Sequence, residues 1–323
     1  MPGISLPPFP DDVPTHPLLV VDYELIKNGN VQEIEKLWKA ATELGFWYLK
    51  NHGVDHEVDQ MFEMGVETMD LPLDEKMQFQ QGDDGRPHGY KPAGANATDE
   101  HGSPDTVEAI NVSHDDALAY PAVAHRTYPS TVNARMESTI RPFVRKSFEV
   151  NHTVLSIFEK KLGLPAGALL KYHELEDLSG SEARVIKSPP RPGAVTLTES
   201  AKEKASLGAH TDFGSLSFLH NRLGGLQVLP PGSPTWQYAT HVRWSTVYFT
   251  RPKSDAPLRA LSDGTAIKEV VERISAEERK RFEPGVTASE WYARRIRNQR
   301  IKNRKGPETY RASRGMEHRP DAI

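Results

Sequence analysis

The chain has 323 residues, of which 37% are hydrophobic and 26% charged, and its net charge is −4. A chain of this length and composition can bury a large core, which excludes a disordered chain and a disulfide-stapled miniprotein. Cysteine is absent, so thiolate metal sites and cysteine nucleophiles are excluded. The net charge gives no overall attraction to nucleic acid. No apolar run approaches the ~20 residues of a membrane helix. The acidic, proline-rich start lacks the pattern of a secretory signal. We therefore expect a cytoplasmic protein.

The first fifty residues carry strand and helix patterns. Leu18 to Asp22 is a short apolar run that predicts a buried strand. The apolar residues between 31 and 44 recur at three- and four-residue intervals, which predicts a helix capped by Asn30 and ended by Gly45. Residues 46–49 then have strand composition.

The middle of the chain changes from loop to helix and then to sheet. Gly82 to Asp105 is rich in Gly, Pro, Asp and Asn without periodicity, which predicts a long surface loop of the kind that often carries function. A helical pattern runs from about Ala134 to Leu162, and Pro142 is expected to kink or divide it. From about Arg184 the sequence favours a sheet-rich second half. Strands are expected at 194–198, 216–219, 226–229 and 244–249, and helices at 265–282 and 288–304.

His210-Thr211-Asp212 is the sharpest local signal for chemistry. In an extended strand, residues two apart project from the same face, so an imidazole and a carboxylate at this spacing can bind one metal ion from one side. These would be two ligands of a facial triad of two histidines and one carboxylate, which leaves positions open on iron(II). The alternative is a hydrogen-bonded surface turn, because the triplet alone is a weak signal.

Arg243 and Ser245 form a second pair with this spacing, at the start of a predicted strand. The Arg243 guanidinium offers a fixed fork of donors for a carboxylate, and Ser245 can add a hydroxyl to the same oxygen. The alternative reading of Arg243 is a solvated charge at a strand end.

An ordered series of segments extends these signals over most of the chain. The segments are 19–22, the helix from Val31, 45–54, 71–76, Gly89-Tyr90, 184–190, 210–212, 224–228 and 243–245. Together they resemble the isopenicillin-N-synthase-like branch of the iron(II)/2-oxoglutarate-dependent dioxygenases. The resemblance implies an α+β fold, a double-stranded β-helix (jelly roll) with flanking helices. The expected division is an N-terminal region at 1–130, bridging helices at 131–178, a shortened jelly-roll core at 179–255 and a helical tail at 256–323.

The same resemblance implies the activity. A family member uses iron(II), oxygen and 2-oxoglutarate, with ascorbate as a possible reductant, to hydroxylate or desaturate a small organic metabolite. His210 and Asp212 would hold the metal, with no catalytic residue expected beyond the metal ligands, and Arg243 and Ser245 would hold 2-oxoglutarate. Arg184 and the Gly82–Asp105 loop are expected on the substrate side. We expect a monomer with no nucleic-acid or membrane partner.

The sequence departs from the family pattern between Trp236 and Arg243. The family would carry further strands there, including one with the distal metal-binding histidine. The stretch from His210 to Arg243 fits about four strands of ~5–6 residues with loops of ~2–5, so we expect the roll to lack two or more strands. His241 is a weak third candidate ligand, and His220 is weaker.

Three other readings therefore remain open. The chain could be a catalytically impaired relative that acts as a binding or scaffold protein, the product of a shortened gene, or an oxidase that needs iron without 2-oxoglutarate. Succinate release separates these readings, because an oxygenase needs both iron and 2-oxoglutarate, an oxidase needs iron alone, and a scaffold releases none.

The remaining polar clusters favour structural roles. Lys187 and Ser188 stand where relatives place residues beside 2-oxoglutarate, but a strand end before Pro189 is an equal reading. His52 and His56 have a spacing that could bind metal on a helix, yet their setting indicates a turn. His114-Asp115-Asp116 is expected in a loop. Residues 291–314 hold nine basic residues and one acid, and their interleaved apolar residues favour a helix packed on the roll over a nucleic-acid patch.

Overall fold

The computed structural model describes residues 16–189, 206–208, 210–222, 226–228, 237–239, 244–282 and 284–314. The N-terminal elements are β1 (Val20–Asp22), α1 (Tyr23–Lys27), α2 (Val31–Glu43), β2 (Tyr48–Lys50), α3 (Asp55–Met69), α4 (Leu73–Met77), β3 (Gly89–Lys91), β4 (Glu108–Ser113) and α5 (His114–Ala119). The middle elements are α6 (Ser130–Ala134), a π-helical turn (Met136–Ile140), α7 (Arg141–Lys161), a 3₁₀ turn (Leu170–Tyr172) and β5 (Glu182–Lys187).

The second half contains the remaining strands and the C-terminal helices. The strands are β6 (Leu216–Arg222), β7 (Leu226–Val228), β8 (Gln237–Ala239) and β9 (Trp244–Thr250). The helices are α8 (Thr265–Arg273), α9 (Ala276–Phe282), α10 (Ala288–Gln299), a 3₁₀ turn (Ile301–Asn303) and α11 (Pro307–Arg314). Within the described ranges, no helix combines the length and apolar character that a membrane crossing requires.

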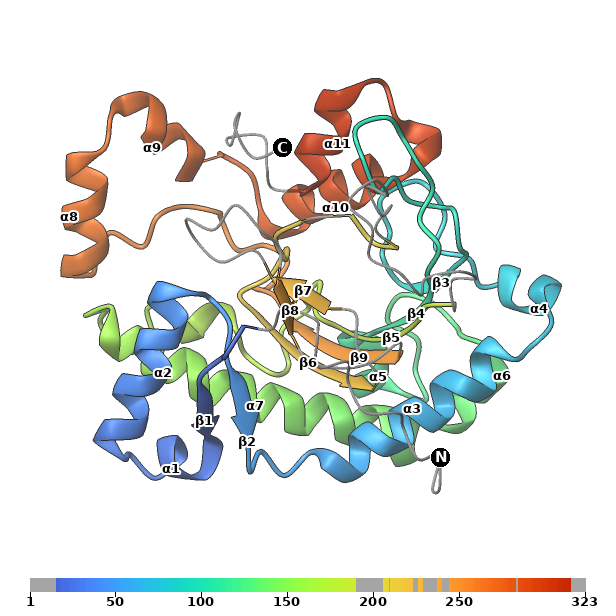
Figure 1. Cartoon of the computed structure of the whole chain (residues 1–323), viewed down its shortest axis with the longest axis horizontal. Coiled ribbons are helices and arrows are strands. Elements are labelled where there is room, and N and C mark those ends of the chain that lie inside the picture. Colours follow the sequence, from blue (N-terminus) through green and yellow to red (C-terminus); the bar gives the residue numbers. More distant parts are fainter. Residues whose placement is uncertain are drawn as a thin grey trace.

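The central element is a five-stranded antiparallel sheet in the order β3-β4-β5-β9-β6 (Figure 1). Strands β7 and β8 pair with each other in a separate antiparallel ribbon, and β1 pairs with β2 in parallel. In sequence, β3 and β4 of the central sheet precede residues 131–178, and its other strands follow them. The division of the chain into regions stays a prediction. The described strands agree with an α+β fold, and the expected loss of strands from the roll also stays a prediction.

One face of the central sheet is apolar and packs on α3 and α7, which run beneath it in Figure 1. Val185, Tyr248 and Phe218 come from neighbouring strands and pack in one buried cluster with Phe143 and Met61 from the helices. Burial of this apolar surface is the main favourable contribution to the fold.

The opposite face of the sheet is polar. Because side chains alternate along a strand and paired residues share a face, Glu182, Arg184 and Asn111 lie together with Ser245 and Ser217 on this second face. Helices α10 and α11 lie above it in Figure 1. Buried polar groups need partners or ligands, so this face is where a site can be built.

Several predicted elements are confirmed with small shifts. Helix α2 begins after Asn30, whose side chain accepts a hydrogen bond from the Glu33 backbone N–H at 2.9 Å, and Gly45 follows the helix at φ +82°. The predicted strands at 18–22, 46–49, 216–219, 226–229 and 244–249 correspond to β1, β2, β6, β7 and β9. The predicted strand at 194–198 lies outside the described residues.

Two predictions were wrong in local detail, and one helix boundary was confirmed. Gly89–Lys91 is a fully buried strand inside the predicted surface loop, because it pairs with β4. The predicted helix is divided beside Pro142, as expected, because a π-helical turn ends at Ile140 and Pro142 lies in the first turn of α7, where its missing N–H is not needed. His114 begins helix α5 rather than a loop and is 2% exposed.

The segment between β9 and α10 is closed at its base by backbone hydrogen bonds. The Ala288 N–H donates to the Ala256 carbonyl at 2.9 Å, and the Leu258 N–H donates to the Val286 carbonyl at 3.0 Å. Helices α8 and α9 extend from this base away from the central sheet (Figure 1). Val270 and Phe282 on these helices are 54% and 51% exposed, so this excursion adds little to the core.

Helix α3 approaches the sheet most closely at Gly65, where an added Cβ would stand 2.4 Å from Val185 Cγ1. We expect Gly65→Ala to lower the free energy of unfolding by about 1–3 kcal/mol through overpacking, although alanine favours a helix more than glycine does. Urea denaturation followed by circular dichroism measures the change. In the double variant Gly65→Ala, Val185→Ala, the loss in free energy of unfolding should be smaller than the sum of the losses in the two single variants. Losses that simply add would contradict this contact.

Candidate functional site

The His210–Asp212 segment is held in place by the C-terminal helices. The Thr211 N–H donates to the Arg314 carbonyl at 3.1 Å, and the Phe213 ring lies 6.0 Å, between centroids, from both Trp291 and Tyr292 on α10. Residues 210–212 are not in a strand, contrary to the geometry assumed from the sequence, since β6 begins only at Leu216. The segment depends instead on α10 and α11.

The structure nevertheless brings the two candidate metal ligands together. His210 Nε2 lies 3.5 Å from Asp212 Oδ1, and His210 Nδ1 lies 2.9 Å from the Gly208 carbonyl oxygen. In the metal-free protein a protonated His210 pairs with Asp212, whereas the neutral imidazole, with its proton on Nδ1 donated to that carbonyl, presents its Nε2 lone pair on the side of Asp212 for a metal. This is the usual arrangement of a metal-binding histidine.

Electrostatics around Asp212 favour its charged form. Burial alone would raise its pKa, but hydrogen bonds from His210 and Ser217, together with the charge of His210, outweigh burial and lower the pKa to about 2. Ser217 Oγ donates to Asp212 Oδ2. The carboxylate is therefore ionised at any physiological pH, as a metal ligand must be.

A third ligand is not found in the part of the chain that the structure describes, where no group of three His, Asp or Glu side chains could hold a metal ion. His220 is on the apolar side of the sheet, with its ring centroid 4.3 Å from Phe218 and 5.3 Å from His52. Burial lowers the pKa of His220 to about 3. His52 and His56 do not converge on a site either, and His241 lies outside the described residues.

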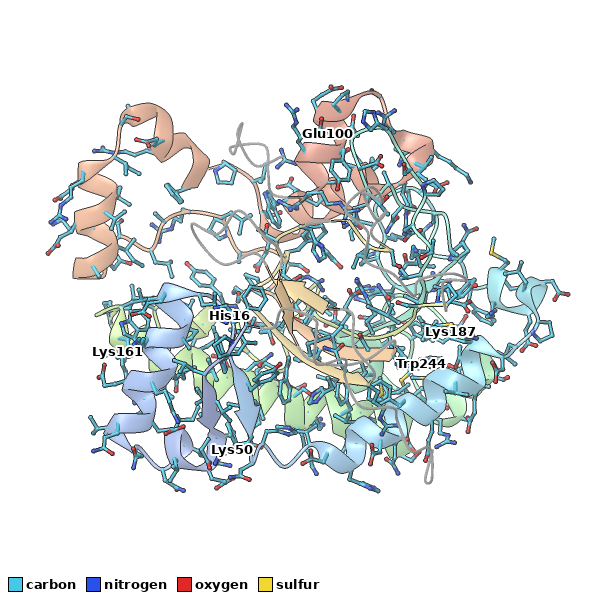
Figure 2. The ribbon with its side chains drawn as sticks, in the orientation of Figure 1. His16, Lys50, Glu100, Lys161, Lys187 and Trp244 are labelled. Atoms are coloured by element: carbon cyan, nitrogen blue, oxygen red, sulfur yellow. The ribbon has the colours of Figure 1, made fainter. Side chains whose placement is uncertain are left out.

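The two expected 2-oxoglutarate residues have different outcomes. Arg243 lies outside the described residues. Ser245 is on the polar face of the sheet, where its Oγ donates to Asn221 Oδ1 at 2.5 Å. Lys187 is on the opposite face, where its Nζ lies 5.8 Å from the Trp244 ring centroid and 3.7 Å from Glu108 (Figure 2). The strand-end reading therefore describes Lys187 better than a place beside 2-oxoglutarate.

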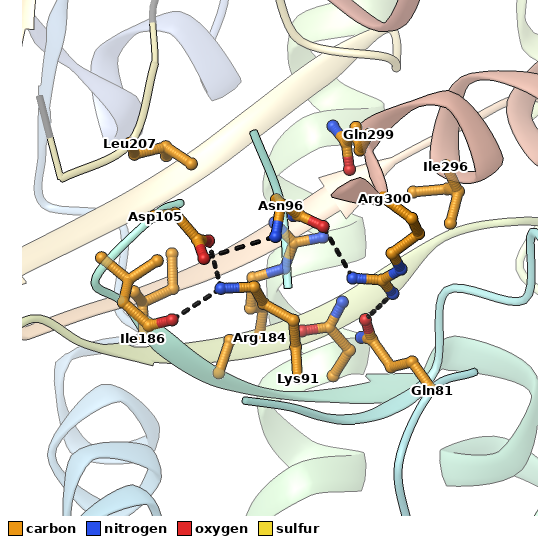
Figure 3. Close-up of a pocket in the computed structure, with 13 residues that line it drawn as sticks. Gln81, Lys91, Asn96, Asp105, Arg184, Ile186, Leu207, Ile296, Gln299 and Arg300 are labelled. Atoms are coloured by element: carbon orange, nitrogen blue, oxygen red, sulfur yellow. Dashed lines mark hydrogen bonds and ion pairs between the residues drawn. The ribbon is translucent and has the colours of Figure 1, made fainter. Parts of the chain in front are cut away.

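A small cleft of about 40 Å³ opens on the polar face (Figure 3). Arg184, predicted on the substrate side, lines it together with Lys91 and Asp105 from the 82–105 region. Arg300, at the end of α10, and Leu207, three residues before His210, also line it. The structure thus brings Arg184 and part of the predicted functional loop into one cleft.

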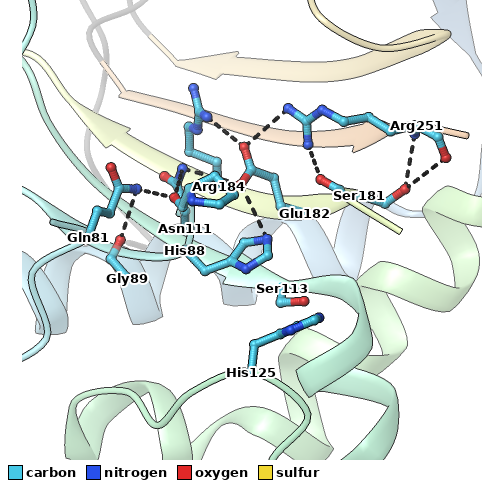
Figure 4. Close-up of polar contacts among 12 residues, drawn as sticks. Gln81, His88, Gly89, Asn111, Ser113, His125, Ser181, Glu182, Arg184 and Arg251 are labelled. Carbon is cyan, nitrogen blue, oxygen red and sulfur yellow. Dashed lines mark hydrogen bonds and ion pairs between the residues drawn. The ribbon is translucent and has the colours of Figure 1, made fainter. Parts of the chain in front are cut away.

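A buried charge network supports this face of the sheet (Figure 4). The Glu182 carboxylate is fully buried and accepts hydrogen bonds from Arg184 at 2.5 Å and from Arg251 at 3.3 Å, while His88 Nε2 lies 3.9 Å away. Burial alone would raise the pKa of Glu182, but Arg184, Arg251 and His88 lower it below its usual range. Burial lowers the pKa of His88 to about 4, so this histidine is neutral at pH 7.

The sequence did not single out Glu182, Arg251, His88, Lys91 or Arg300. One signal was available for Arg300, because Tyr292, Ile296 and Arg300 follow one another at four-residue spacing on the face of α10 that the structure buries. The prediction that this basic tail packs against the rest of the chain is confirmed, since Tyr310 and Arg314 on α11 are also buried.

Replacing the buried carboxylate tests this network. We expect Glu182→Gln to lower the free energy of unfolding by about 3–5 kcal/mol, because the buried Arg251 and the half-buried Arg184 would lose their shared anion. Chemical denaturation measures the loss. Because the pKa of Glu182 is lowered, the wild type should lose this contribution as the pH falls through that pKa, and the variant should lack that part of the acid sensitivity.

Glu272→Gln is the matched control, since its exposed pair with Lys268 at 4.0 Å should contribute no more than about 0.5 kcal/mol. A similar small effect for Glu182→Gln would contradict the network.

Comparisons with known proteins agree with these features. The sequence family described as "non-haem dioxygenase in morphine synthesis N-terminal" matches residues 18–133. The homoarginine-6-hydroxylase 2-ODD-233 of Oryza sativa is 26% identical over 215 residues, which are 63% of this chain and 60% of that protein. The 2-oxoglutarate-dependent dioxygenase frbH of Dothideomycetidae sp. is 25% identical over 234 residues, 68% of this chain and 66% of that protein. The chain thus spans less than two thirds of the length of these relatives.

A solved structure shares the fold. A full-length Neurospora crassa protein, solved in complex with alpha-KG, superimposes with a TM-score of 0.65 at 18% identity, covering 86% of this chain and 95% of that one. The fold resemblance expected from the sequence is confirmed by this likeness. Taken with the family match and the named relatives, it agrees with the resemblance of the chain to the iron(II)/2-oxoglutarate-dependent dioxygenases that the sequence indicates.

Proposed function

We propose that the chain is an iron(II)- and 2-oxoglutarate-dependent oxygenase that hydroxylates or desaturates a small organic molecule. The observation that carries the proposal is the 3.5 Å approach of His210 Nε2 to Asp212 Oδ1, with Nδ1 held by the Gly208 carbonyl. The proposal includes a monomeric, cytoplasmic enzyme with no nucleic-acid partner.

The donor set agrees with iron(II). Two ligands at ~2.1 Å from one ion and at right angles to each other stand about 3 Å apart, close to the separation of His210 Nε2 and Asp212 Oδ1. Imidazole and carboxylate are two members of the facial triad of non-haem iron oxygenases, and bound iron would activate oxygen there. His241 stays a weak candidate for the third ligand, and ascorbate is the proposed reductant.

The chain's own residues orient and neutralise the co-substrate. Arg243 is proposed to hold the far carboxylate of 2-oxoglutarate, with the Ser245 hydroxyl donating to the same oxygen. Ser245 lies on the polar face with Ser217, whose hydroxyl donates to Asp212. The partner of Ser245 on β6 is Asn221, four positions from Ser217, so the two serines are about 13 Å apart along the strand. Ser245 can reach such a ligand by releasing Asn221.

A second candidate is a binding or scaffold protein with an impaired metal site. The observation that favours it is that only two of three metal ligands are found among the described residues. A site with two protein ligands would bind iron weakly and position oxygen poorly. The departure from the family pattern between Trp236 and Arg243 also leaves open the product of a shortened gene. An iron-dependent oxidase is a further alternative.

Calorimetry of the full chain with Mn(II), a redox-inert substitute for iron, tests the metal site. We expect Mn(II) to bind, 2-oxoglutarate to bind only with the metal, and Asp212→Ala to abolish both, because it removes the only carboxylate of the pair. His56→Ala, which removes an exposed histidine, is the control and should bind like the wild type.

Succinate release separates the alternatives. An oxygenase releases succinate only with iron(II) and 2-oxoglutarate together, and Asp212→Ala should lower that release by at least about 100-fold. Iron-dependent oxygen consumption without 2-oxoglutarate would indicate the oxidase. A wild-type chain that binds neither Mn(II) nor 2-oxoglutarate would reject the oxygenase and leave the binding protein.

A further inference from the structure

The cleft on the polar face carries more positive than negative charge. Lys91, Arg184 and Arg300 line it with one acid, Asp105 (Figure 3). Asp105 is already engaged, since it pairs with Lys91 and accepts the Gly94 N–H at 2.8 Å. Its charge therefore mainly offsets that of Lys91, and Arg300 feels Asp105 and Asp83 only at a distance, without an ion pair to either.

Arg300 is the least compensated of these cations. It is 3% exposed, and its two terminal nitrogens donate to neutral amide oxygens, Asn96 Oδ1 at 2.7 Å and Gln81 Oε1 at 2.5 Å. Its Nε is buried and has no hydrogen-bond partner among the described residues. A buried guanidinium in direct contact with neutral amides alone has lost its hydration without gaining a contacting counter-ion.

Arg184 and Lys91 extend the same positive surface. Arg184 shares Glu182 with Arg251, and its own Nε is also buried without a partner. Burial, Arg300 and Arg184 lower the pKa of Lys91 to about 8 although Asp105 opposes the shift. The three cations are therefore close enough to repel one another, and an anion among them would relieve that repulsion.

The size and position of the cleft define what the anion can be. Its volume of about 40 Å³ accommodates a few waters or one carboxylate group. Arg184 on β5 and Ser217 on β6 lie on the same face of the sheet, with β9 between their strands, and are offset by two residues along the strand direction. Their backbones are therefore about 12 Å apart. A small molecule anchored in the cleft can thus extend over this face toward His210 and Asp212.

We propose that the cleft binds the carboxylate of the substrate, with Arg300 as its principal anchor, so that the substrate is a small organic acid. This inference rests on the proposed oxygenase function, and it assigns the cleft to the substrate rather than to 2-oxoglutarate. Arg184 supplies the second guanidinium, and Lys91 contributes a nearby positive charge. The bound carboxylate occupies the donors that are unpartnered in the free protein.

Binding of a carboxylate and of its neutral analogue to the full chain, without metal or 2-oxoglutarate, tests the proposal. Ligand-observed NMR titration with benzoate and benzamide should give at least about tenfold tighter binding of benzoate. In Arg300→Gln the preference should disappear. Arg297→Gln is the control, because Arg297 lies on the same helix one turn earlier, is exposed, and does not line the cleft.

A second variant guards against loss of folding. Asn96→Asp places a carboxylate against Arg300 in the position of the bound anion, so it should raise the melting temperature while weakening benzoate binding at least about tenfold. Equal binding of benzoate and benzamide by the wild type, or unchanged benzoate binding in both Arg300→Gln and Asn96→Asp, would overturn the proposal.

The pH dependence gives an independent readout. The charged groups that face Lys91 are Asp105, Arg184 and Arg300. A bound anion favours protonated Lys91, so benzoate affinity should fall as the pH rises above about 8. An affinity that rises over that range would contradict the placement of the anion beside Lys91.

Separate titration of Mn(II) and 2-oxoglutarate distinguishes this inference from the proposed function. Both should bind Arg300→Gln as they bind the wild type. If Arg300→Gln loses 2-oxoglutarate and benzoate displaces it, the cleft is the co-substrate site and this inference fails while the oxygenase stands. If benzoate binds through Arg300 but the wild type binds no Mn(II), the oxygenase fails and the carboxylate site stands.

Discussion

The polar face of the central sheet depends on one buried carboxylate. Glu182 is shared by Arg184 and Arg251, one from its own strand and one from the end of β9. Without this anion the guanidinium groups could not remain under α10, because unpaired buried charge is strongly unfavourable. The same carboxylate therefore permits both a positive cleft beside Arg184 and dense packing of the C-terminal helices over the sheet.

The candidate metal pair depends on those helices rather than on the sheet. The Arg314 carbonyl holds Thr211, and α10 packs its aromatic residues against Phe213. Among the described residues, the hydrogen bond from Ser217 to Asp212 connects the pair to a strand. Arg300 follows directly on α10, so the proposed anchor of the substrate and the support of the metal ligands belong to one element.

The sequence predicts elements with strong local patterns and fails where partners decide. Helix α2 has a periodic apolar face and a good N-cap, and β9 is a run of β-type residues, so both follow from local physics. Strand β3 has three residues, Gly89 among them, and forms only because β4 pairs with it. Pro142 marks the boundary at which α7 begins, as its fixed backbone predicts.

The same distinction applies to the site. The short spacing of His210 and Asp212 was enough to predict their approach, although a loop under α11 produces it rather than a strand. Glu182 could not be recognised as a site-building group, and helical spacing indicates only that Arg300 faces inward, because their partners are far away in the sequence and long-range packing decides which charges are buried. Arg300 bonds to Gln81 and Asn96, about two hundred residues earlier.

The closed base of the α8–α9 excursion has a consequence for how this chain can vary. Backbone hydrogen bonds at Ala256 and Ala288 already bring its two ends together, so its length is decoupled from the spacing of β9 and α10. Since the entropy of closing a loop changes only slowly with its length, shortening, lengthening or exchange of this excursion is a low-cost route to new surface, and it leaves the central sheet and the candidate site undisturbed.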